Sequence, residues 1–305
     1  MKKFSKVLAL FMCATMLFGV MTGCAAAEKA PTAESLLKGY QEKVQSAEGM
    51  KADVDMDLQM KVSVFGMEES IKMGGTMNVE SSGENAYAKA DFTMESSEGT
   101  ETAQTEIYVM KEGDKFVEYQ CTDGEWTKTS VDGAGQIDGL IKNKYVGDPA
   151  KFTMETTDTE YVLKGTVSIK EAMESMPEGM FDEMMTSMGS EMTEDMLANI
   201  SDVPVEYHFD KKTRDLTSMS MDMTTAMQEL FAVAMQEAMA ELGDLEGMEG
   251  MEDFDMSTLF NFEVGALKLN VKNIVYEAVT ITLPEEAKNA KEVSADDMSV
   301  LNIGE

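Results

Sequence analysis

The feature of this sequence that most constrains its fold is a strict alternation of apolar and polar residues from Met50 to Val64. Every even position in this stretch is apolar, and every odd position between them is polar. Successive side chains of a β-strand point to opposite faces of its sheet, so the pattern predicts one long strand with one apolar and one solvated face. An amphipathic helix is excluded, because its apolar residues would recur every three or four positions.

Similar alternation recurs along the chain and predicts a sheet of many strands. Turn residues such as Glu112-Gly113-Asp114 and Asp123-Gly124 separate consecutive repeats, which favours an antiparallel meander. Further strands are expected near residues 71–79, 86–94, 103–110, 115–121, 126–130, 151–156, 159–169, 203–209, 216–223, 259–271 and 274–283.

Helical spacing of apolar residues appears in three stretches, and a weaker helical stretch is expected near 133–145. A short amphipathic helix is expected before Gly49, and longer helical stretches are expected at 170–200 and 225–242. Because the strands are apolar on one side only and the helices are amphipathic, we expect an α+β fold. Its sheet would be strongly curved and antiparallel, an unclosed β-barrel, with the helices on the concave face.

The N-terminus has the pattern of an export signal. A basic start with Lys2, Lys3 and Lys6 precedes an uncharged apolar run that is too short to span a membrane. The stretch Val20-Met21-Thr22-Gly23-Cys24 then resembles the bacterial lipobox. This resemblance implies that diacylglycerol is attached to Cys24, and that the protein is lipid-anchored at the outer face of the cell membrane.

These signals predict the organisation of the whole chain. Residues 1–23 are expected to be a lipoprotein signal peptide and residues 24–32 a tether. Residues 33–305 would form a single domain with helical insertions near 170–200 and 225–257. Cys13 would leave with the signal and Cys24 would carry the lipid, so Cys121 would be the one remaining thiol and the stability of the domain cannot come from an internal disulfide. Cys121 itself is interpreted as a small buried side chain.

Composition excludes several classes of function. A formal net charge of -32 argues against a nucleic-acid partner, because such a protein needs clustered Lys and Arg to meet phosphates. The one histidine, His208, has no Ser, Cys or metal-ligand residue nearby in the sequence, and no nucleophile or phosphate-loop motif is present. We therefore expect no enzyme activity, no cofactor and no metal site.

Two late segments resemble a known group of proteins. The segment 279–287 begins Val279-Thr280-Ile281-Thr282-Leu283-Pro284, and the hairpin 207–213 contains Asp210-Lys211-Lys212-Thr213. Together with the lipobox and the long strands, they resemble uncharacterised Gram-positive lipoproteins related to the LolA and LppX carriers. That resemblance implies an unclosed barrel wrapped on helices, with an apolar cavity that accepts lipid chains.

Methionine is unusually frequent, and three interpretations stay open. Of the 31 methionines, 17 lie between Met173 and Met256. They fit the apolar faces of the predicted elements, as plain core or as a deformable lining, since the unbranched thioether adapts to different partners. The third interpretation is Cu(I) binding by thioethers. Its candidate residues are Met219, Met221 and Met223, or Met184, Met185 and Met188.

The function that we expect is binding of a lipid or acyl chain between sheet and helices. The predicted groove is lined by Met56, Leu58, Met60, Met73 and Met77 from the sheet and by Met184, Met188, Phe231 and Met235 from the helices. The alternative is a non-enzymatic, acidic cell-surface interaction module whose core is filled. A large apolar void would indicate the first function, and a well-packed interior would indicate the second.

Overall fold

The computed structural model describes residues 30–64, 67–97, 99–122, 124–131, 147–174, 197, 199–243 and 260–293. Residues 33–305 form one compact unit, and the description that follows concerns this unit alone. The predicted signal peptide, the lipidation site Cys24 and the groove candidates Met184 and Met188 lie outside the described residues. So does most of the predicted 170–200 helical stretch, of which α4 (Ile169–Glu174) is described.

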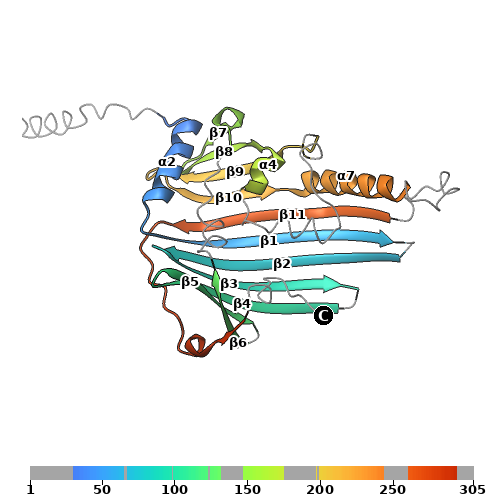
Figure 1. Ribbon diagram of the computed structural model, residues 1–305. Coiled ribbons are helices and arrows are strands. Elements are labelled where there is room, and N and C mark those ends of the chain that lie inside the picture. The colour runs from blue at the N-terminus through green and yellow to red at the C-terminus, as the bar shows by residue number, and fades with distance from the viewer. Residues whose placement is uncertain are drawn as a thin grey trace, which may run out of the picture. The chain divides into compact units, whose positions relative to one another are not determined.

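Within the described ranges, twelve strands form one curved, unclosed sheet, in the order β12-β6-β5-β4-β3-β2-β1-β11-β10-β9-β8-β7 (Figure 1). All neighbours are antiparallel except β12 and β6, which pair in parallel. The predicted fold class is therefore confirmed. The strands are β1 (Gly49–Val64), β2 (Met67–Ser82), β3 (Asn85–Ser96), β4 (Gly99–Glu112), β5 (Lys115–Thr122), β6 (Glu125–Val131), β7 (Thr153–Thr156), β8 (Glu160–Val167), β9 (Val203–Asp210), β10 (Leu216–Asp222), β11 (Phe260–Val275) and β12 (Lys291–Glu292).

The alternating segment forms β1, the central strand of this sheet. It pairs with β2 on one side and with β11 on the other, so that Leu58 lies opposite both Met73 and Leu267. Both neighbours are as long as β1, and the three strands therefore place their apolar side chains on the same face over many rungs. We call this side the apolar face.

The helices pack their apolar sides against the same core as the apolar face. Helix α2 (Ala33–Ser46) buries Leu36, Leu37, Tyr40 and Val44, as its spacing predicts. Helix α7 (Thr224–Gly243) contributes Met227, Leu230 and Phe231 to the same cluster.

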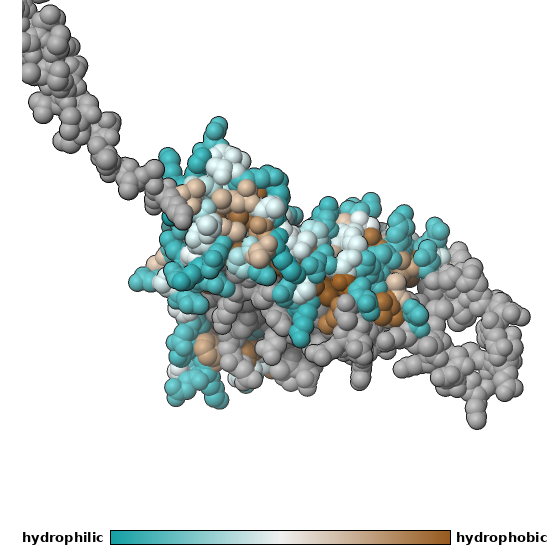
Figure 2. All heavy atoms as spheres, turned by 90° about the horizontal axis from the view of Figure 1, so that it is seen from above, coloured by the Kyte–Doolittle hydropathy of each residue, from teal (hydrophilic) through white to brown (hydrophobic). Residues whose placement is uncertain are grey.

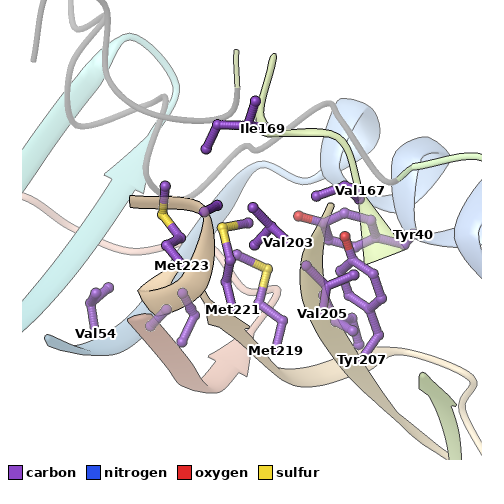
Figure 3. Packing of buried hydrophobic residues seen from close by; sticks show 14 of the residues in the cluster. Tyr40, Val54, Val167, Ile169, Val203, Val205, Tyr207, Met219, Met221 and Met223 are labelled. Atoms are coloured by element: carbon purple, nitrogen blue, oxygen red, sulfur yellow. The ribbon is translucent and has the colours of Figure 1, made fainter. Parts of the chain in front are cut away.

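Figure 3 shows one part of this core, where Met219 and Met221 of β10 lie beside Val203 and Val205 of β9. Met219, Met221 and Met223 are all buried in it. Their packing accounts for these three methionines as ordinary core residues, so they carry no argument for copper. The alternative copper set, Met184, Met185 and Met188, lies outside the described residues.

Helix α7 also covers an edge of β11. Strand β10 pairs with β11 only between Met219 and Asp222, and α7 begins directly afterwards. The side chain of Gln228 donates to the carbonyl of Phe262 (2.9 Å) and accepts from the N–H of Val264 (2.6 Å). A helix side chain thus pairs backbone groups that a neighbouring strand would otherwise pair.

The chain after β11 differs from the prediction. A strand was expected at 274–283, but β11 runs without a break to Val275 and the next residues belong to no strand. Ile281 and Leu283 instead pack into a second cluster around Tyr108 and Tyr119, on the side of the sheet opposite the apolar face. Their alternation is explained by this packing. After the 3-10 turn η3 (Glu286–Asn289), β12 then pairs with β6.

Candidate functional site

The five sheet residues of the predicted groove lie together on the apolar face. Met56, Leu58 and Met60 are alternate residues of β1, and Met73 and Met77 lie on β2. Leu58 faces Met73, which in turn faces Met94 of β3. All five predicted side chains are half-buried.

Burial changes along β1. Near α2, Met50 and Val54 are only 1% and 3% exposed and belong to the core cluster. Further from α2, several half-buried apolar side chains of β1, β2 and β3 are not among the described residues that pack against that cluster. Six of them lie on the apolar face of these three adjacent strands, and we call them the distal patch: Met56, Leu58, Ile71, Met73, Phe92 and Met94.

A glycine shapes the middle of this patch. Gly75 lies between Met56 and Phe92 in one rung of the sheet. A Cβ atom on Gly75 would come within 2.3 Å of Cδ1 of Phe92, so the Phe92 ring occupies the space above Gly75. The ring therefore lies across β2, toward Met56.

Of the four helix residues of the predicted groove, Phe231 is the one whose side chain lies within the described residues. Phe231 of α7 is 6% exposed, and its ring centroid lies 4.2 Å from that of Phe262 on β11. Phe231 is thus a core residue that joins α7 to β11. Met235 lies one turn later on α7, but its side chain is outside the described residues. Figure 2 shows hydrophobic side chains gathered at the surface in the region of α7, on an otherwise mostly hydrophilic view.

The sequence interpretation missed a polar region of the apolar face. Glu118 and Gln120 of β5 face Thr129 and Thr127 of β6, and we call these four residues the polar block. Glu118 also faces Val109 of β4, which belongs to the core cluster, so the block lies on the same side of the sheet as the distal patch. Gln120 and Thr129 are only 8% and 6% exposed.

Three of the four residues of the polar block lack side-chain partners in the described part of the chain, whereas Thr127 is engaged. Among the described residues, no hydrogen bond or ion pair is made by the side chains of Glu118, Gln120 or Thr129. Burial raises the pKa of the Glu118 carboxyl, because a low-dielectric surrounding disfavours the charged form. A half-buried acid without a counter-charge is typical of a functional site.

His208 and Cys121 give no support for catalysis. Nδ1 of His208 lies 3.2 Å from Glu160 and its Nε2 lies 2.8 Å from Glu206, on the solvated side of β8 and β9. In the described parts of the chain, no three His, Cys, Asp or Glu side chains are placed to hold a metal ion. Cys121 was expected to be buried, but it is only half-buried, opposite Trp126 on the other side of the sheet from the polar block. Within the described ranges, no helix has the length and hydropathy needed to cross a membrane.

Comparison with known proteins supplies a family but no activity. The model of a family of unknown function, DUF6612, matches residues 32–242. No curated protein matches the chain. Fifteen chains of solved structures match, among them a DUF1329 family protein from Desulfovibrio piger ATCC 29098. It is 9% identical, the match covers 83% of this chain and 94% of that chain, and the TM-score of 0.18 supports no inference.

Proposed function

Since this chain belongs to DUF6612, a family of unknown function, we propose its function from the chemistry of its apolar face. The protein is a membrane-anchored extracytoplasmic lipoprotein that binds a lipid or another molecule with an acyl chain. The ligand lies on the distal patch, and no reaction follows its binding. The observation that carries this proposal is the set of half-buried apolar side chains that lie outside the core cluster.

The composition of the distal patch fits a ligand of variable shape. Three of its six members, Met56, Met73 and Met94, carry flexible and polarisable thioethers. Apolar side chains that are left partly in water gain about 25 cal/mol for each Å² that a ligand covers. A mobile lining can follow chains of different length or unsaturation without a large cost in packing.

The anchoring part of the proposal comes from the N-terminal sequence. The lipobox-like stretch ending at Cys24 supplies the attachment site, and two acyl chains hold a protein firmly at a membrane. Anchoring would keep the apolar face next to the lipids that serve as its ligands.

The test uses the whole chain with Cys24→Ser, which removes the acylation site. We expect lipid to travel with the natively purified protein in mass spectrometry, and the neutral apolar dye N-phenyl-1-naphthylamine to bind it. Met73→Gln should weaken dye binding about fivefold, because a partly buried thioether contact contributes about 1 kcal/mol. Met110→Gln is the matched control, since Met110 is half-buried on the opposite face and packs against the second cluster.

Two results would contradict this function. One is a chain that carries no lipid and binds no dye, which would leave the acidic interaction module with a filled core as the better description. The other is equal weakening by Met73→Gln and Met110→Gln, because binding would then not take place on the distal patch.

A further inference from the structure

The polar block is the part of the apolar face that the function proposed above leaves unused. It occupies two adjacent rungs of β5 and β6, with Glu118 opposite Thr129 and Gln120 opposite Thr127. Most of the remaining apolar face is hydrophobic, so this block makes the face amphipathic across the width of the sheet.

Polar groups that leave water on folding need hydrogen-bond partners inside the protein. Buried side-chain polar atoms in proteins are almost always hydrogen-bonded, and a buried charge normally has a partner. The side chains of Glu118, Gln120 and Thr129 have no such partner within the described part of the chain. Their polar atoms keep some contact with solvent, because Ser81 Oγ is the one described side-chain atom that is fully buried without a partner. A ligand group that donates hydrogen bonds would take the place of that solvent.

We infer that the polar block binds the polar end of the same ligand, and that this end is a protonated amine. The inference rests on the proposed function, because the acyl part of the ligand must lie on the distal patch. An ammonium group donates three hydrogen bonds and would form charge-assisted bonds with the Glu118 carboxylate. The side-chain carbonyl of Gln120 and the hydroxyl of Thr129 can accept the remaining hydrogen bonds.

The two regions lie at a suitable separation. Gln120 faces Ile107 of β4, which faces Ala88 of β3, four residues along that strand from Phe92 of the distal patch. Four residues along a strand and two strand spacings give a separation of about 16 Å. The face between them carries Ala88, Ala90 and Ile107, with Thr105 beside Ala90, so an acyl chain that joins the two regions would meet mostly apolar side chains.

The charges around the block favour a cation over an anion. An anionic head group would meet the like charge of Glu118. Lys111 lies near the block but is already paired, with its Nζ 2.6 Å from both carboxylate oxygens of Glu84. Lys291 pairs with Thr127 on the edge strand β12 and is exposed. An exposed lysine offers an anion little energy, because water screens it.

The experiment compares three head groups on one alkyl chain. Dodecylamine, 1-dodecanol and dodecanoate compete with N-phenyl-1-naphthylamine for the whole chain carrying Cys24→Ser. We expect dodecylamine to displace the dye at an about tenfold lower concentration than 1-dodecanol, the ratio that one hydrogen bond to a charged group produces. Dodecanoate should be the weakest competitor. In Glu118→Gln the ratio of amine to alcohol should fall to about one.

A matched variant separates the site from the overall negative charge. Glu95→Gln removes the same charge from an exposed position on the other face of β3, and it should keep the amine preference. Equal binding of amine and carboxylate, or a preference that survives in Glu118→Gln, overturns the inference while the proposed function stands. A wild-type chain that binds no dye overturns both.

Discussion

At the scale of single residues, Glu118 has opposite effects on stability and on binding. Its carboxylate is half-buried without a partner, so its ionisation is unfavourable in the folded chain. A residue that costs stability in the free protein but serves a ligand is a common feature of binding sites. The effect of Glu118 on stability can therefore be tested without any ligand.

Glu118→Gln should stabilise the ligand-free protein at neutral pH. The folded pKa of Glu118 is raised above its ordinary value of 4.5, so the folded state loses stability as the pH rises through the raised pKa. Below the ordinary pKa both states are protonated, and the advantage of Gln should disappear. Thermal unfolding of both variants from pH 4 to pH 8 measures this difference. A constant difference, or a less stable Glu118→Gln at pH 8, contradicts it.

Gly75 is a second residue whose role can be tested alone. Gly75→Ala should destabilise the protein by about 1–3 kcal/mol, the usual cost of overpacking, because the new Cβ would collide with the Phe92 ring. Adding Phe92→Ala should remove most of that penalty, so the two changes should be strongly non-additive. Urea unfolding of the two single variants and the double variant measures the coupling.

The neighbouring residue Gly74 is the control. The nearest atom to a Cβ at Gly74 is the carbonyl oxygen of Met56 at 4.0 Å, which is ordinary contact. Gly74→Ala should therefore leave stability nearly unchanged. A large loss in Gly74→Ala, or additive effects of the Gly75 and Phe92 changes, would show that the Phe92 ring does not lie over Gly75.

At the scale of elements, α7 takes over the role of a strand along part of β11. The side-chain amide of Gln228 bonds the carbonyl of Phe262 and the N–H of Val264, next to the tilted ring pair of Phe231 and Phe262. The helical spacing correctly predicted α7. It could not predict that a polar residue of α7 would pair the backbone of a strand more than thirty residues away.

Gln228→Ala should loosen the junction between α7 and β11. Two backbone groups would lose their partner, at a cost of about 1–3 kcal/mol if both stay buried. Hydrogen exchange of the Val264 amide should become faster, and the midpoint of urea unfolding should fall. Gln236→Ala is the control, because Gln236 is exposed on the same helix. Similar effects of both substitutions would mean that helix propensity, not the junction, sets the stability.

At the scale of the whole molecule, the alternation of side chains was enough to predict the curved sheet and the apolar face. Met56, Leu58 and Met73 share that face because a period of two leaves no other arrangement once β1 pairs with β2. The strand expected at 274–283 was wrong. Its alternation is real, but Ile281 and Leu283 pack on the second cluster, and no sequence pattern states which surface an extended segment meets.

The polar block could not be predicted because it depends on register. Glu118 and Gln120 alternate with Tyr119 and Val117 on β5, so the local pattern gives no reason to place the polar set on the apolar face. The pairing of Glu118 with Val109 and of Gln120 with Ile107 on β4 determines that both polar side chains lie on the apolar face. The pairing of β4 with β3 then places the polar block on the same face as the distal patch. These contacts join residues far apart in the sequence, which a local pattern does not predict.

Photolabelling with an alkyl diazirine tests the central claim most directly, since it maps where an apolar molecule lies on the chain. We expect adducts on peptides that contain Met56, Met73 and Phe92. Peptides from the buried core around Met221 and from the second cluster around Ile281 and Leu283 should stay nearly unlabelled. Labelling that is spread evenly over both faces of the sheet, or that avoids the distal patch, would contradict the account.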